Sequence, residues 1–115
     1  MKTLLLTTAL LFAGNLAMGQ THDMAGMVDP ALQPLMAPMD TMMAAMPMQS
    51  TGNPDADFLL MMIPHHQSAI DMARVELTAG TDPATRAMAE AIIAAQEGEI
   101  ATMKAMLTAM GVAID

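Results

Sequence analysis

Hydrophobic and polar positions follow a helical period over two long stretches of the chain. The first covers about residues 54–79, with Asn53 before it as an N-cap and Gly80 after it as a helix stop. The second opens after another capping residue, Asp82, and covers about residues 83–110. The linker between them is short, so we expect two antiparallel helices that pack as a hairpin.

A third, shorter helix is predicted over Pro38–Met46, because Pro34 and Pro38 interrupt any helical pattern that begins earlier. Four methionines of this segment have the i, i+3, i+4, i+7 spacing of one helical face. The stripe is either the core-facing side of the helix or a ladder of thioethers that binds a soft metal ion. Its members are Met39, Met42, Met43 and Met46.

The first 19 residues have the features of a secretory signal peptide. Lys2 precedes an apolar run, and the small residues Ala17 and Gly19 stand before a cleavage point at Gln20. The run is too short to span a bilayer, so we expect no membrane insertion after cleavage, with a retained anchor as the alternative. The mature protein would be periplasmic or secreted. Residues 20–37 are then a flexible arm containing methionine and histidine, and residues 38–115 are the helical domain.

The core faces of the two long helices carry polar residues that meet at one level of the predicted hairpin. His65 and His66 both fall in the apolar arc of the first helix. Gln96 and Glu99 fall in the apolar arc of the second, at the height of the histidines when the hairpin is folded about its turn. Buried polar groups need partners, and a metal ion is one candidate. The convergence of these four residues therefore predicts a binding site at this level of the hairpin.

The amino-acid composition indicates which kind of ion that site would bind. The chain has 17 methionines, no cysteine, and a formal charge of −8. The negative charge argues against nucleic acid and anionic membranes as partners. Methionine on this scale, together with histidine, favours binding of Cu(I), or of Ag(I) as a similarly soft ion.

Two interpretations of the site stay open at this stage. Adjacent histidines lie about 100° apart on a helix, so they are unsuited to binding one ion together. Met62, one of the histidines and Met103 would form a low-coordinate sulfur and nitrogen set for Cu(I), with Glu99 or Gln96 orienting the imidazole. Alternatively, His66 and Glu99 form a polar pair that only orients the two helices.

An enzyme is not expected. Neither histidine has a glutamate three residues before it, as ferritin-like di-iron sites require, and no His-Glu-x-x-His motif occurs. The chain also lacks a cysteine nucleophile and a serine in a nucleophile elbow.

Residues 57–73, with the sequence DFLLMMIPHHQSAIDMA, resemble the family catalogued as domain of unknown function 305, which includes CopM-like extracytoplasmic copper-binding proteins. The spacing of residues 89–103 agrees, and the match covers about residues 55–107. The resemblance implies an all-α, ferritin-like helical bundle that binds Cu(I) and Ag(I) for copper sequestration, resistance or delivery. The ligand-type positions it implies are Met62, His65, His66, Met72 and Met103, with Asp71, Gln96 and Glu99 as matching polar positions.

A protein-interaction module is the second hypothesis. Methionine gives a surface that adapts to different partners, and a copper exporter or oxidase is the kind of partner implied. Three helices also leave one face of the hairpin poorly covered, and a homodimer would cover it.

Overall fold

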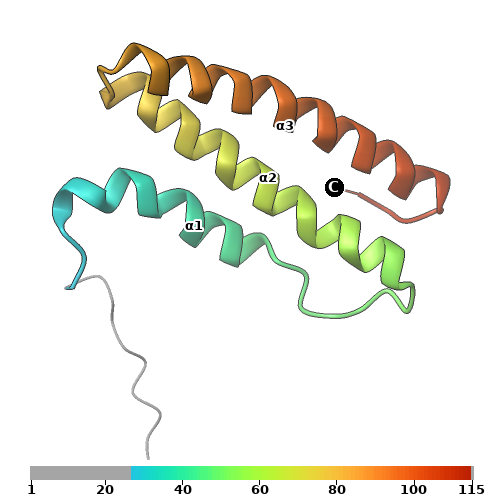
Figure 1. The fold of residues 1–115 in the computed structure, drawn as a ribbon. Coiled ribbons are helices and arrows are strands. Elements are labelled where there is room, and N and C mark those ends of the chain that lie inside the picture. The colour runs from blue at the N-terminus through green and yellow to red at the C-terminus, as the bar shows by residue number, and fades with distance from the viewer. Residues whose placement is uncertain (1–26, 115) are drawn as a thin grey trace, which may run out of the picture.

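The structure is a computed structural model that describes residues 27–114. Over these residues the chain is all-helical, as predicted (Figure 1). The predicted signal peptide and residues 20–26 of the predicted arm lie outside the described residues. The elements in chain order are the 3-10 helix η2 (Pro30–Leu32) and the α-helices α1 (Gln33–Ala45), α2 (Pro54–Ala79) and α3 (Pro83–Ala109).

The three α-helices form a bundle-like array with α2 in the middle. α2 and α3 are joined by a short turn and pack along their length as the expected antiparallel hairpin (Figure 1). α1 packs against α2, and within residues 27–114 its backbone does not come close to that of α3. None of the helices in this part of the chain has the combination of length and apolar character needed to cross a membrane.

The ends of the hairpin helices follow from local sequence. The Asn53 side chain accepts a hydrogen bond from the backbone N–H of Asp55 (3.0 Å) and so caps α2. The Asp82 carboxylate accepts one from the backbone N–H of Thr85 (2.7 Å) and caps α3. Both caps confirm the predicted starts. α3 ends at the predicted place too, where Gly111 takes the left-handed conformation (φ +73°).

A residue of α3 caps the C-terminal end of α2. The last turn of α2 carries no basic side chain of its own. Arg86 instead donates from Nη1 to the backbone carbonyls of Leu77 (2.7 Å) and Gly80 (3.0 Å). A cation at these carbonyls complements the negative end of the helix dipole. The turn between α2 and α3 is thus fixed by Arg86 in addition to the Asp82 cap.

α1 begins five residues earlier than the prediction, at Gln33 instead of Pro38. Pro34 falls in the first turn, where its missing N–H costs no intrahelical hydrogen bond. Pro38 lies inside the helix and is buried. The predicted boundary was wrong because packing of the Pro38 ring compensates for the hydrogen bond that the ring removes.

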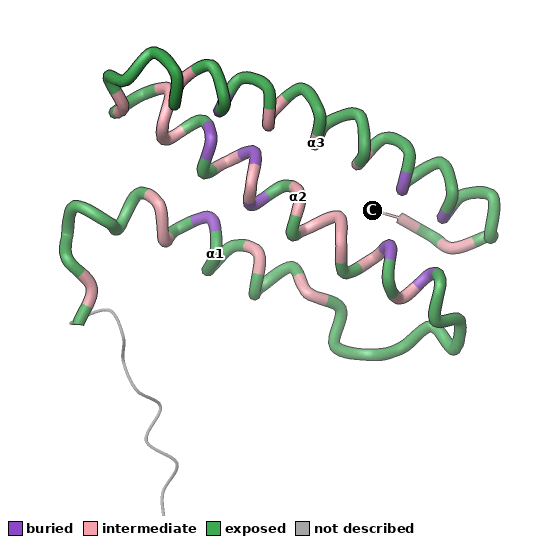
Figure 2. Tube along the Cα trace, viewed as in Figure 1, coloured by how far each residue is buried: buried purple, intermediate pink, exposed green. Residues whose placement is uncertain are grey.

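The core is thin and lies where α2 faces α3 (Figure 2). Ala56, Leu59, Met103 and Leu107 form its main cluster, near the open end of the hairpin. Beyond α3 the chain turns back, and residues 112–114 pack against this cluster. Many large apolar side chains remain exposed, so the single chain leaves a methionine-rich surface.

Candidate metal centre

His66 joins α2 to α3 at the level that the sequence predicted. Its Nε2 lies 2.6 Å from Oε2 of Glu99, and its Nδ1 donates to the backbone carbonyl of Met62 (2.9 Å). The His66 side chain is 13% exposed and that of Glu99 is 62% exposed. The contact confirms the antiparallel register expected from folding the two helices about their turn.

These contacts occupy both ring nitrogens of His66. A carbonyl oxygen only accepts hydrogen bonds, so the contact with Met62 places a hydrogen on Nδ1. Nε2 is then the nitrogen available to a metal ion, and an ion there has to displace the Glu99 carboxylate.

Two methionines and His66 line one hollow on this side of the hairpin. Met62 on α2 is half-buried, and Met103 on α3 is buried. The hollow has a volume of about 350 Å³, and Glu99 and Thr102 also contribute to its wall. Two thioethers and one imidazole are the donor set that a soft monovalent ion takes. Phe58 and Leu59 complete the lining.

His65 does not belong to this hollow. We expected both histidines on the core face, and for His65 that expectation was wrong, since its side chain is exposed. The part of α2 that packs on α3 includes the buried Leu59 and Ile70, which lie about 120–140° around the helix from His65. The apolar arc read from the sequence is wider than the surface that α3 covers.

An exposed stripe on α2 contains His65 and its neighbours on that side of the helix. Phe58 is 61% exposed, Met61 is 46% exposed and Met72 is 36% exposed. Their spacing places them on one side of α2 together with His65. Met72 is therefore not brought to His66, and it lines a different surface from Met62 and Met103.

The predicted methionine ladder of α1 is divided between two environments. Met42 and Met46 are half-buried, while Met39 and Met43 are exposed. Met42 lines a groove of about 430 Å³ between α1 and the hairpin, together with Pro38 and residues of α2 and α3. The four methionines thus do not all face the core, although each i, i+4 pair remains on one side of the helix.

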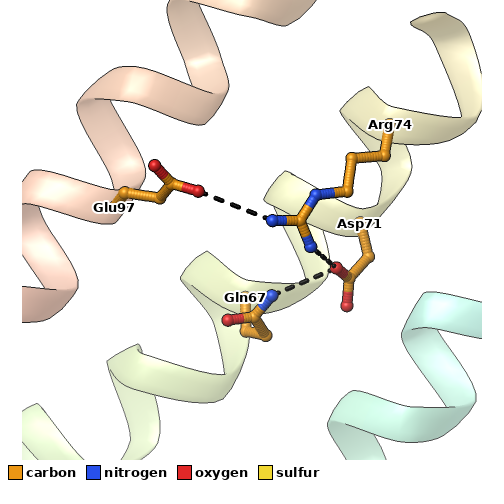
Figure 3. Close-up of polar contacts among 4 residues, drawn as sticks. All are labelled: Gln67, Asp71, Arg74 and Glu97. Carbon is orange, nitrogen blue, oxygen red and sulfur yellow. Dashed lines mark hydrogen bonds and ion pairs between the residues drawn. The ribbon is translucent and has the colours of Figure 1, made fainter.

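Gln96 and Asp71, the other two predicted polar positions, lie in different places. Gln96 is half-buried, and its side-chain Oε1 is buried without a hydrogen-bond partner among the described residues. Asp71 lies elsewhere, in a surface network on the other side of α2 (Figure 3). Its carboxylate accepts hydrogen bonds from Gln67 (3.1 Å) and Arg74 (3.0 Å), and Arg74 also reaches Glu97 on α3 (3.5 Å).

Asp57 organises the loop between α1 and α2, a role that sequence analysis missed. Its carboxylate accepts hydrogen bonds from the Ser50 hydroxyl and from the backbone N–H and hydroxyl of Thr51 (2.7 Å each). The hydrogen bonds from Ser50 and Thr51 lower the pKa of Asp57 below its ordinary value of 3.8. The sequence signal was Ser50 and Thr51 shortly before an N-terminal helix aspartate, which on its own indicates only a turn.

No three side chains from histidine, aspartate and glutamate come together as a potential metal site within residues 27–114. The chain contains no cysteine. A metal centre of three or more side chains in this part of the chain would therefore need a donor of another kind, and methionine sulfur is one. The hollow between Met62, His66 and Met103 fits that requirement.

Comparison with known families gives one match. The family described as domain of unknown function 305 matches residues 6–107, which include all three α-helices except the last two residues of α3. A search of curated proteins found no match. The matched range extends well before residues 55–107, which carry the resemblance in the sequence. The chain belongs to the domain of unknown function 305 family.

Proposed function

We propose that this chain is an extracytoplasmic protein of the CopM-like kind, which binds Cu(I), and Ag(I) as a surrogate, for copper sequestration, resistance or delivery. The observation that carries the proposal is the shared hollow of Met62, His66 and Met103. Thioether and neutral imidazole groups prefer soft ions, whereas Ca²⁺ and Mg²⁺ prefer oxygen ligands. The donor set thus selects for copper in its reduced state.

The residues of the hollow have separate tasks in this proposal. Met62 and Met103 supply sulfur from facing helices, so that capture of an ion links α2 to α3. His66 supplies Nε2, which contacts the Glu99 carboxylate in the ion-free protein. The displaced Glu99 carboxylate stays at the rim, where its charge partly neutralises a bound cation.

Competition with a chromophoric Cu(I) chelator under anaerobic conditions tests the proposal. The double variant Met62→Leu/Met103→Leu keeps volume and apolarity, so packing changes little, but it removes both thioethers. We expect its Cu(I) affinity to fall by at least about 10-fold to 100-fold, since even hydrogen-bond partners of metal ligands have effects of that size. Ag(I) should compete with Cu(I), and Zn(II) should not.

Met88→Leu is the matched control, because Met88 lies on α3 but is exposed and outside the hollow. It should bind Cu(I) like the wild-type protein. Equal affinity of the wild-type protein and the Met62/Met103 double variant would rule out this hollow as the binding site. Equal losses in the control and the double variant would indicate a nonspecific effect of methionine content.

A protein-interaction module is the second candidate function, and two observations favour it. Exposed apolar side chains cluster on α2, including Phe58 and Met61. His66 also has partners for both ring nitrogens without any metal. In this case the polar pair orients the helices, and the methionine surface docks a copper exporter, an oxidase or a second copy. The leucine double variant would then retain partner binding, and neither it nor the wild-type protein would bind Cu(I) tightly.

A further inference from the structure

The segment Met61–His66 contains the same methionine and histidine pairing twice. Met62 and His66 are four residues apart, and so are Met61 and His65. Residues with this spacing are neighbours on a helix surface, about 5–6 Å apart at Cβ. The two pairs are offset by one residue and thus point about 100° apart. We call Met62 and His66 the inner pair, and Met61 and His65 the outer pair.

One member of the outer pair, Met61, has a further soft donor beside it. Met61 lines a small hollow of about 200 Å³ together with Met48 and other residues of the loop between α1 and α2. Met48 is far more exposed than the methionines of the inner hollow. The loop is held to α2 by the hydrogen bonds of Ser50 and Thr51 to Asp57, one helical turn before Met61. Met48 is therefore held on the same side of α2 as Met61.

His65 differs from His66 in its hydrogen bonds. Within residues 27–114, the His65 ring makes no hydrogen bond, whereas both ring nitrogens of His66 are engaged. An ion that binds His65 consequently displaces no hydrogen-bond partner among residues 27–114. The outer pair is also exposed, so an ion can reach it directly from solvent.

We infer that Met48, Met61 and His65 form a second, surface site for a soft monovalent ion, separate from the hollow of the inner pair. This inference rests on the proposed function, since it concerns the same cargo, Cu(I) or Ag(I). The adjacent histidines then serve two different sites, one on each side of the contact with α3. The outer site receives ions from solvent, and the inner site retains them between two helices.

The number of Cu(I) ions bound per chain, measured by native mass spectrometry and by anaerobic chelator competition, tests this inference. The variant Met61→Leu/His65→Gln removes both helical donors of the outer site and leaves the inner pair in place. We expect it to bind one ion fewer than the wild-type protein, with the affinity of the inner site retained. Met72→Leu is the control, because it alters the same exposed stripe without touching either pair, and it should keep the wild-type ion count.

The variant Met48→Leu tests whether the outer site has three donors or only Met61 and His65. We expect the outer ion to bind at least about 10-fold more weakly in this variant, while the inner ion is unaffected. An unchanged outer affinity would remove Met48 from the site and overturn the three-donor arrangement.

The other outcomes distinguish this inference from the proposed function. An unchanged ion count in Met61→Leu/His65→Gln would overturn the outer site and leave the inner site standing. Loss of every ion in that variant would show that the two histidines serve a single site, which also contradicts the inference. A wild-type protein that binds no Cu(I) would overturn both proposals.

Discussion

The inner and outer pairs of α2 have the same residues at the same spacing, but their surroundings differ. The inner pair faces α3, where His66 meets Glu99 and Met62 lies in the same hollow as Met103. The outer pair faces solvent, and the soft donor beside its methionine is Met48, from the loop between α1 and α2. A rotation of about 100° along the helix thus separates a half-buried, hydrogen-bonded histidine from an exposed one. Spacing determines which residues are neighbours, and packing determines their chemistry.

The largest difference that we expect between the two sides of α2 is in how much an alanine substitution lowers the free energy of unfolding. Ile70 is 1% exposed on the side that packs on α3, whereas Met72 lies on the exposed stripe. Ile70→Ala should lower the free energy of unfolding by about 2–5 kcal/mol, because it leaves a cavity in a thin core. Met72→Ala should change it by about 0.5 kcal/mol or less. Chemical denaturation of both variants measures the contrast, and similar losses would mean that Met72 is buried in solution, as in a dimer.

Substitution of each histidine in turn compares the pairs directly. His66→Gln removes a half-buried group with two hydrogen bonds, so we expect it to lower the free energy of unfolding by about 1–2 kcal/mol. His65→Gln should have an effect within about 0.5 kcal/mol, since the side chain is exposed. Urea titration of the ion-free proteins is the measurement. A larger cost for His65→Gln would contradict the assignment of inner and outer sides.

The smallest expected effect concerns the loop that holds Met48. The pKa of Asp57 is lower in the folded protein than its ordinary value of 3.8, because Ser50 and Thr51 donate hydrogen bonds to the carboxylate. Its contribution to stability is therefore present above pH 3.8 and is lost as the pH falls through the lowered pKa. Asp57→Asn should show a weaker loss of stability over that acid range, as followed by circular dichroism. An unchanged acid profile would mean that another carboxylate dominates it.

The local elements of this fold are readable from sequence, and so is one long-range contact. Asn53 and Asp82 act as caps where the sequence places them, because capping depends on neighbouring residues only. The pairing of His66 with Glu99 follows from the short turn, which fixes the register of the hairpin. These features depend on the order of residues within one or two helices.

The features that sequence analysis missed depend on where a third element lies. His65 is exposed because the covered side of α2 is set by the positions of α1 and α3, which a helical wheel does not contain. The methionines of α1 are divided for the same reason. Arg86 of α3 donates to carbonyls at the end of α2, a contact that depends on how the two helices meet. Each of these outcomes required the tertiary arrangement.

The central claim is that facing helices supply sulfur to one soft ion between them. Ag(I) titration of protein labelled with ¹³C at its methionine methyl groups tests it most directly, because each methyl signal reports on its own sulfur. We predict that the signals of Met62 and Met103 shift together and saturate at the same Ag(I) level, while that of Met88 stays unchanged. If Met62 and Met103 do not shift while other methionines do, the hollow between α2 and α3 is not the binding site.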